Sequence, residues 1–252
     1  MLVYVINLDR DRDRLAHTRE QLAGVAFTRV PAVDGTTSAE TAAGLTRFEL
    51  ACLASHREAW RRFLATSAPH ACFLEDDLHI WPGFGALVED CAWVPPDAHA
   101  VKLDTYFQTV RLGVRRPAAG GREVARLYSR HESSAAYLLS RAGAARYLEL
   151  TDPPKLPADY SLFPKTPRRL GLVIYQLAPA VAIQDHLRPA AEGGQRFDTA
   201  MNAGAPARAR PRSGLARLAR EAARLAGQAR DASEVVALRS SVKTATATVP
   251  VG

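Results

Sequence analysis

The stretch Ala71–Ile80, with the sequence ACFLEDDLHI, places three consecutive carboxylates at the end of an apolar run. Residues 71–74 have the length and composition of a buried strand. Glu75, Asp76 and Asp77 follow at its carboxyl end, where like charges repel unless a positive group lies among them. Because side chains alternate in an extended segment, we expect Glu75 and Asp77 to face one way and Asp76 the other.

The segments before this stretch indicate a parallel sheet. Residues 2–8 (LVYVINL) form a short apolar run typical of a buried strand, and a helical pattern with Leu15 and Leu22 follows and ends at Gly24. Residues 27–33 (FTRVPAV) are a second strand candidate. A strand–helix–strand order is typical of parallel α/β sheets.

The remaining elements follow from caps, breakers and periodicity. Thr46 and Glu49 form a capping box, which predicts a helix from there to about residue 67. Further strands are expected at residues 100–103 and 172–183, and a hairpin around residues 111–122. Helices are expected at residues 82–91 and 133–150.

The basic character of the chain is concentrated in its last fifth. The net charge is +7, and residues 205–252 hold nine basic side chains against three acidic ones. A change of composition near Ala203 suggests a body at residues 1–203 and a basic helical tail at residues 204–252. We expect the last twenty residues to be disordered.

The tail contains a predicted amphipathic helix. In residues 213–225 the leucines share one helical face with Ala222, and Arg217, Arg220 and Arg224 share the opposite face. Such a basic helix at residues 213–230 suits an anionic membrane surface. A helix docked on the body or on a partner protein is an equally good interpretation.

Three cysteines without CxxC spacing favour a reducing, cytoplasmic compartment. The N-terminus lacks the basic segment of a signal peptide, and no apolar run approaches the length of about 20 residues that spans a bilayer. We therefore expect a cytoplasmic protein that is either free or peripheral on the inner face of the cell membrane.

The acidic stretch predicts a metal site. Glu75 and Asp77, beyond the end of a strand, can hold a hard divalent cation such as Mg²⁺ or Mn²⁺. Open α/β sheets bind ligands at this edge, and a cation there can also bind phosphate oxygens. A nucleotide sugar is the natural ligand, since the metal stabilises the charge that develops on its diphosphate. An acidic turn that only opens the next helix is the alternative.

Seven short motifs occur in a fixed order along the body: VINLDRDRDR at 5–14, RVPAVDG at 29–35, FELACLASHREAW at 48–60, CFLEDDLHI at 72–80, VKLDT at 101–105, SSAAYLLSRAGAARYL at 133–148 and LPADYSLF at 156–163. Together they resemble the glycosyltransferase family 25 pattern found in lipopolysaccharide and lipooligosaccharide biosynthesis enzymes. The resemblance implies a GT-A-like fold with a mostly parallel, nucleotide-sugar-binding sheet flanked by helices. It also implies an inverting mechanism and, commonly, galactosyl transfer from UDP-galactose.

The resemblance assigns candidate donor-binding residues in the first half of the chain. Asn7 and Arg14 match the opening motif, where they could bind the nucleotide and its phosphates; Leu15 stands where a second arginine is frequent. Asp34 and Gly35 match a turn that could bind uracil or ribose, and a simple tight turn is the alternative.

The third motif of the family contributes Cys52, Ser55 and His56, with Ala51 in place of the usual glycine. His56 could donate to a diphosphate or orient the metal carboxylates, although a lone helical histidine is more often structural. A serine hydrolase triad is not expected, because Ser55 and His56 point about 100° apart on a helix.

Lys102 and Asp104, in VKLDT, alternate to one side of a strand. Lys102 could contact the diphosphate and Asp104 the sugar hydroxyls, and an ordinary ion pair is the alternative. An inverting transfer also needs a general base at the acceptor hydroxyl. Asp159, which matches the acidic position of the seventh motif, is the first candidate and Asp104 the second; Asp159 could instead cap a helix.

The sequence thus predicts a metal-dependent inverting transferase that moves a hexose from a UDP-sugar to a hydroxyl of a surface glycolipid. A metal-dependent hydrolase of phosphoesters or nucleotide sugars is one alternative. A non-catalytic nucleic-acid-binding or scaffold protein built on the basic tail is another. The body is nearly neutral and lacks a basic–aromatic pattern, so nucleic acid is not an expected partner.

Overall fold

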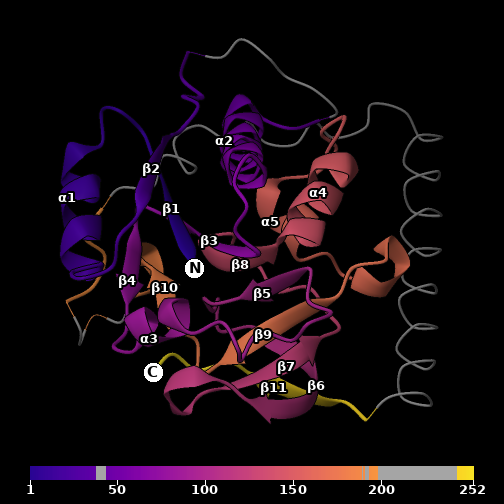
Figure 1. Cartoon of the computed structure of the whole chain (residues 1–252). Helices are drawn as coiled ribbons and strands as arrows, with labels where there is room; N and C mark the ends of the chain where they lie inside the picture. Colours follow the sequence, from indigo (N-terminus) through magenta and orange to yellow (C-terminus); the bar gives the residue numbers. More distant parts are fainter. Residues whose placement is uncertain (38–43, 189, 191–192, 198–242) are drawn as a thin grey trace.

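The strand that carries Glu75 lies inside a nine-stranded sheet with helices on both sides (Figure 1). This computed structural model describes residues 1–37, 44–188, 190, 193–197 and 243–252. The sheet comprises β1 Leu2–Asn7, β2 Thr28–Pro31, β3 His70–Glu75, β5 Ala100–Lys102, β6 Thr109–Pro117, β7 Glu123–Leu127, β8 Ala136–Ser140, β9 Ile174–Ala178 and β11 Ala245–Thr248. The expected α/β class is confirmed.

A second sheet pairs β4 Leu78–Ile80 with β10 Ala182–Gln184 in antiparallel fashion. The helices are α1 Arg12–Gln21, α2 Arg47–Leu64, α3 Phe84–Glu89, α4 Arg141–Leu150 and α5 Ala158–Leu162. Short 3₁₀ turns occur at Ala119–Gly121, Pro167–Leu170 and Asp185–Leu187.

The large sheet is mixed, in the order β11-β6-β7-β9-β5-β8-β3-β1-β2. Strands β2, β1 and β3 are parallel, as the strand–helix–strand pattern predicts, and β5 is parallel to β9. Strand β8 lies antiparallel between β3 and β5, and β7, β6 and β11 continue the sheet in antiparallel pairs. The carboxyl ends of β1 and β3 therefore meet at one edge.

Alternate side chains of the central strands belong to two separate hydrophobic cores, one on each face of the sheet. Tyr4, Phe73 and Tyr137 join one core, which also contains Trp60 and Phe63 of α2. Val3, Cys72 and Leu138 join the other core, together with side chains of α3. Helices α2, α4 and α5 pack on one another on the first face, as Figure 1 shows.

The predicted helix over residues 133–150 is wrong in its first half. Residues 136–140 form β8, and α4 begins only at Arg141, with the Ser140 side chain accepting a hydrogen bond from the Gly143 amide (3.1 Å). The alanines favour a helix locally, but this segment is buried on both faces between β3 and β5. Tertiary burial overrides the local preference.

Two other expectations need correction. The strand region expected at residues 172–183 divides into β9 and the separate β10. The last twenty residues are not all disordered, because residues 245–248 form β11 against β6 and the Pro250 carbonyl accepts from the Ala180 amide (2.8 Å). The predicted basic helix at residues 213–230 lies outside the described residues. Among the helices of the described residues, none has the length and apolar character needed to cross a bilayer.

Candidate active site

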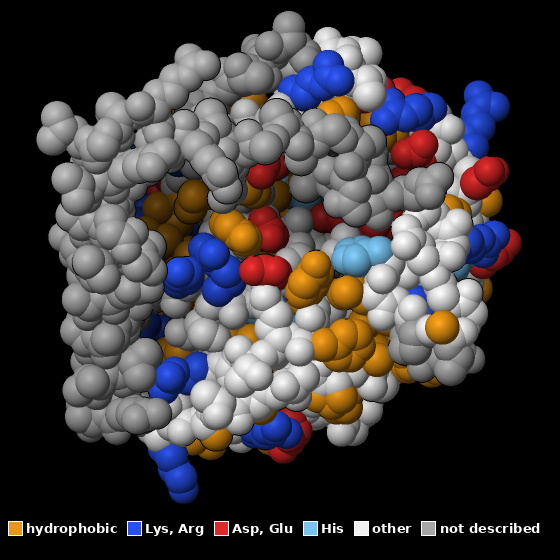
Figure 2. Space-filling view, turned by 180° about the vertical axis from the view of Figure 1, so that it is seen from behind, with side chains coloured by type: hydrophobic (Ala, Val, Ile, Leu, Met, Phe, Trp, Pro, Cys, Tyr) orange, Lys and Arg blue, Asp and Glu red, His pale blue; other side chains and the backbone are white. Residues whose placement is uncertain are grey.

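Two neighbouring cavities lie beyond the carboxyl ends of β1 and β3. The first cavity, of about 150 Å³, is lined by Asn7, Arg14, Gly35, Ser55 and His56 among others. The second cavity, of about 290 Å³, is lined by Glu49, Tyr106, Glu132, Asp159 and Gln184 among others. Cys52 and Glu75 line both cavities. Figure 2 shows acidic side chains gathered in a hollow of the face seen from behind.

Glu75, at the end of β3, lies at the junction of the two cavities and is held by three donors. Its Oε1 accepts from Ser134 Oγ (2.8 Å) and His56 Nε2 (3.3 Å), and its Oε2 accepts from Gln184 Nε2 (3.4 Å). Burial alone would raise the pKa of Glu75, but these hydrogen bonds and the charge of Lys102 hold it below the ordinary value. The carboxylate is therefore ionised and fixed in place.

His56 is oriented by a chain of buried groups. The Trp60 indole donates to the Tyr137 hydroxyl (2.8 Å), which lies 2.8 Å from His56 Nδ1. Each hydrogen-bonding group of this chain has a partner when Tyr137 donates to Nδ1 and the proton on Nε2 faces Glu75. Tyr137 belongs to β8, so the strand that the sequence pattern missed supplies the partner of a predicted site residue.

Asp76 is bound by two residues of the opening motif. Its Oδ2 accepts from Asn7 Nδ2 (2.6 Å) and its Oδ1 from Arg14 (3.1 Å). Asn7 Oδ1 accepts in turn from Arg29 Nε (2.8 Å). Burial raises the pKa of Asp76, and these donors offset part of that rise. Asn7, Arg14 and Asp76 thus form one wall of the first cavity.

Asp77 carries a buried oxygen without a partner. Its Oδ1 makes no hydrogen bond within the described part of the chain. Gln184 hydrogen-bonds to the Asp77 side chain and also donates to Glu75 Oε2. Burial, with the charges of Glu75 and Asp76, raises the pKa of Asp77 to about 7. A divalent cation beside Glu75 and Asp77 would satisfy the free oxygen and the excess charge, so the chemistry of this pair fits the predicted metal. Glu75 and Asp76 line the first cavity, whereas Asp77 is not among the residues that line either cavity.

The other residues predicted in the first half mainly shape the first cavity. Asp34 binds Arg10 and accepts from the Thr36 amide (2.8 Å), so its carboxylate closes a turn and does not line the cavity. A Cβ on Gly35 would lie 2.6 Å from Phe48 of α2, and only glycine allows this approach. Ser55 Oγ joins the Val33 amide (2.8 Å) to the Ala51 carbonyl (2.7 Å).

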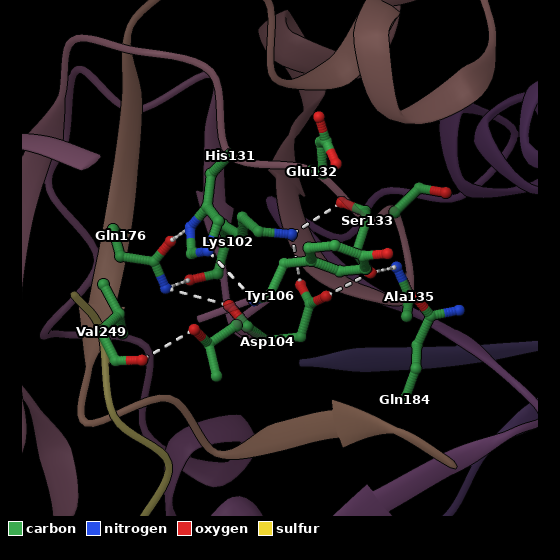
Figure 3. Close-up of polar contacts among 12 residues, drawn as sticks. Lys102, Asp104, Tyr106, His131, Glu132, Ser133, Ala135, Gln176, Gln184 and Val249 are labelled. Atoms are coloured by element: carbon green, nitrogen blue, oxygen red, sulfur yellow. Dashed lines mark hydrogen bonds and ion pairs between the residues drawn. The ribbon is translucent and has the colours of Figure 1, made fainter. Parts of the chain in front are cut away.

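Lys102 and Asp104 form a fully buried ion pair behind the second cavity (Figure 3). Lys102 Nζ lies 2.8 Å from Asp104 Oδ1 and donates to the Ser133 carbonyl (2.6 Å), and Ser133 Oγ donates to Asp104 Oδ2. Burial lowers the pKa of Lys102 and raises that of Asp104, and each charge opposes the shift of the other.

Neither residue of this ion pair is among those that line the two cavities. The predicted contacts of Lys102 with a diphosphate and of Asp104 with a sugar or as second candidate base find no support in this geometry, because both side chains are fully buried and engaged with each other. We infer that the Lys102–Asp104 ion pair holds the loop around Ser133 in place.

The same network fixes the loop after β5. His131 Nε2 accepts from the Tyr106 amide (3.1 Å), and His131 Nδ1 donates to Gln176 Oε1 (2.7 Å). Burial lowers the pKa of His131 to about 3, so the ring is neutral at physiological pH. The Thr105 hydroxyl donates to the Val249 carbonyl (2.7 Å), which ties this loop to the segment after β11.

Asp159 lies in the wall of the second cavity, in the first turn of α5. Its Oδ1 accepts from the Tyr160 amide (2.8 Å), and burial raises its pKa above the ordinary value. The N-cap position is occupied by Pro157, so the alternative of a capping aspartate is wrong. A partly buried carboxylate with a raised pKa has the properties of a general base.

The quoted motifs omit part of the second cavity. Tyr106 and Glu132 follow β5 and β7, Gln184 ends β10, and none of the three lies in a quoted motif. Tyr106 comes just after VKLDT and Glu132 just before the motif at 133–148, and these positions are the signals that could have indicated them.

The geometry agrees with a comparison against known protein families. Residues 1–162 match the model described as glycosyltransferase family 25 (LPS biosynthesis protein). The chain belongs to glycosyltransferase family 25. The matched region contains six of the seven quoted motifs in full and Asp159 of the seventh.

One curated relative of this family 25 chain is the lacto-N-neotetraose biosynthesis glycosyltransferase LgtB of Neisseria gonorrhoeae. The two are 30% identical over 151 residues, which are 56% of this chain and 54% of the relative, so the chain matches about half the length of that protein. A solved glycosyltransferase involved in glycosylation of the PBCV-1 major capsid aligns with a TM-score of 0.39 and 11% identity, over 76% of this chain and 96% of that one.

Proposed function

We propose that this protein is a metal-dependent inverting glycosyltransferase that moves a hexose, galactose first, from a UDP-sugar to a hydroxyl of a lipooligosaccharide or other surface glycan. The observation that carries the proposal is the position of Glu75, at the carboxyl end of a central strand and in the wall of both cavities. A donor in one cavity and an acceptor in the other would meet at this carboxylate.

In this proposal the first cavity holds the nucleotide part of the donor. Arg14 lies in the wall of this cavity and is oriented by its hydrogen bond to Asp76. In this proposal its guanidinium group binds the phosphates of the donor. Gly35 and Phe48 lie close together in the wall of this cavity, where a base or ribose would pack. The relative named for lacto-N-neotetraose biosynthesis supports a hexose donor and a glycan acceptor.

Glu75 and Asp77 would hold Mn²⁺ or Mg²⁺, which when bound supplies positive charge to the leaving diphosphate. His56 keeps the Glu75 carboxylate oriented, because its ring is fixed on the other side by Tyr137. Ser134 and Gln184 contribute the remaining hydrogen bonds to Glu75.

The second cavity would hold the acceptor, with Asp159 as the base that removes its hydroxyl proton. The Asp159 carboxylate accepts a hydrogen bond from the Tyr160 amide, whereas Glu75 is held by three side-chain donors. Asp159→Asn keeps the shape of the carboxylate and removes its basicity, so we expect donor binding to remain and transfer to be lost. Normal turnover in this variant would exclude Asp159 as the base, and Glu132→Gln is the matched control in the same cavity.

A thermal-shift panel of UDP-sugars, each with and without Mn²⁺, tests the donor. We expect UDP-galactose to raise the melting temperature in the presence of Mn²⁺ and UDP-glucose to raise it less, because bound ligands stabilise the folded state. The absence of any stabilisation by a UDP-sugar would contradict the proposal. Release of UDP at full rate without an acceptor would instead favour a hydrolase.

A further inference from the structure

Three side chains with different metal-ligating atoms converge where the two cavities meet. Cys52 and His56 are four residues apart on α2 and so project from one side of that helix. Glu75 faces them from the end of β3. One ligand atom from each residue lies within 4.8 Å of the other two. This is the one such group among the described residues.

The spacing is close to that of a zinc site. With metal–ligand distances of about 2.0 to 2.3 Å and tetrahedral angles, the ligand atoms of bound zinc lie roughly 3.3 to 3.8 Å apart. Atoms within 4.8 Å of one another reach this spacing by small side-chain rotations. Three protein ligands leave the fourth position to water, and because Cys52 and Glu75 line both cavities this position is open to solvent.

The surroundings of the group also suit a metal. The second ring nitrogen of His56 lies 2.8 Å from the Tyr137 hydroxyl, and metal-bound histidines are usually oriented by such a partner. Ser134 Oγ, 2.8 Å from Glu75 Oε1, orients the carboxylate in the same way.

A ligand set that includes a thiolate selects soft cations over Mg²⁺ and Mn²⁺. We propose that Cys52, His56 and Glu75 form a binding site for a thiophilic divalent cation, of which Zn²⁺ is the type, at the junction of the two cavities. On binding, the S–H bond of Cys52 breaks, a bond forms between sulfur and the metal, and the proton leaves to solvent. His56 binds through Nε2, so its ring proton moves from Nε2 to Nδ1, where the Tyr137 hydroxyl oxygen accepts it. No group is oxidised or reduced.

The site has a consequence that rests on the proposed function. Glu75 is also a proposed ligand of the catalytic Mn²⁺ or Mg²⁺, so one carboxylate serves two cations. Zn²⁺ at the junction would then remove Glu75 from the catalytic metal and occupy the space between donor and acceptor. The protein would be inhibited by Zn²⁺ in the presence of saturating Mn²⁺.

Titration of the chain with Co²⁺, without any nucleotide sugar, tests the site directly. Cobalt bound by a thiolate gives a charge-transfer absorption band, which we expect to saturate at one metal per chain and to disappear when Zn²⁺ is added. Cys52→Ser should lose the band, whereas Cys91→Ser, which changes the other partly exposed cysteine, should keep it. A band that persists in Cys52→Ser, or its absence from the unmodified chain, would overturn the proposal.

A second measurement uses the unmodified chain and does not depend on the folding of a variant. Alkylation of the cysteines by iodoacetamide is followed residue by residue by mass spectrometry. We expect Zn²⁺ to slow the reaction at Cys52, Mg²⁺ to have no effect there, and Cys91 to react equally in all cases. Equal rates at Cys52 with and without Zn²⁺, or equal protection by Mg²⁺, would contradict a thiophilic site. Neither assay involves a sugar donor, so failure here leaves the transferase proposal to its own tests.

Discussion

Asp77 is held where its charged form is disfavoured, and this makes the stability of the metal-free protein depend on pH. Its pKa is about 7 in the fold, against an ordinary value of 3.8. Below about pH 4 the carboxyl is protonated in both the folded and the unfolded chain and has no effect on stability. As the pH rises toward 7 the unfolded chain loses this proton and the fold retains it, so the free energy of unfolding falls.

Asp77→Asn removes this penalty, because the amide carries no charge. We expect the variant to raise the melting temperature of the metal-free protein by several degrees at pH 8 and by less at pH 5. The stabilisation by Mn²⁺ should be lost in the same variant, since a proposed ligand is gone. Glu89→Gln, on the exposed end of α3, is the matched control and should change neither quantity. An equal effect of Asp77→Asn at both pH values would contradict the raised pKa.

Lys102 is a second residue whose role can be tested alone, since its charge is fully buried against Asp104. Lys102→Met leaves Asp104 buried without its partner, which typically costs about 3 to 5 kcal/mol. The double variant Lys102→Met with Asp104→Asn removes both charges and should regain part of this loss. Urea unfolding of the single and double variants measures the coupling between the two residues. Unchanged stability of Lys102→Met would show that the pair does not support the loop.

At the scale of the elements, the sequence predicted those helices and strands that are determined by short-range interactions. The Thr46 capping box appears as expected, with Thr46 Oγ1 and the Glu49 carboxylate each accepting from the other's backbone amide (3.2 and 2.7 Å). The apolar runs of β1 and β3 are likewise visible in the sequence. Strand β8 was missed because its alanine and leucines suit a helix, and only its position between two other strands makes it extended.

Strand β11 was missed for a related reason, since its four residues ATAT carry no apolar pattern. It covers the edge of β6 and brings the Val249 carbonyl to the Thr105 hydroxyl. The element therefore supports the loop that carries Tyr106 into the second cavity.

Removal of residues 243–252 should thus destabilise the body as well as shorten the chain. We expect a lower melting temperature and a tendency to aggregate, because β6 becomes an exposed edge strand. Thr105→Val removes only the hydroxyl contact and should lower the melting temperature less, and Thr248→Ala, on the exposed side of β11, should leave it nearly unchanged. A shortened chain that melts like the full chain would show that β11 contributes nothing.

At the scale of the whole molecule, the sequence predicted the position of the site better than the full set of residues that line it. The predicted residues Asn7, Arg14, Ser55 and His56 all line the first cavity, because the ends of neighbouring parallel strands and the helix beside them must meet. The second cavity is built by loops far apart in the sequence, and no local pattern states which loops come together. Lys102 and Asp104 belong to the motif just before Tyr106, yet of these three residues only Tyr106 lines the cavity.

The uneven charge of the chain leads to a prediction about membranes. Residues 205–252 carry nine of the 33 basic side chains but only three of the 26 acidic ones. Truncation after residue 204 cannot test the predicted basic helix by itself, because it also removes β11. Substitution of Arg217, Arg220 and Arg224 by glutamate keeps the length of the chain and reverses the charge of the predicted basic face.

We expect this triple variant to lose binding to anionic vesicles in a cosedimentation assay and to keep transfer to a soluble acceptor. Binding of the unmodified chain should weaken with added salt, since surface charges are screened. The control changes Arg12, Arg19 and Arg116, three exposed arginines of the body, to glutamate and so alters the net charge by the same amount. If both triple variants lose binding equally, net charge and not the helix causes the attraction; if neither does, the chain is not held at the membrane by its tail.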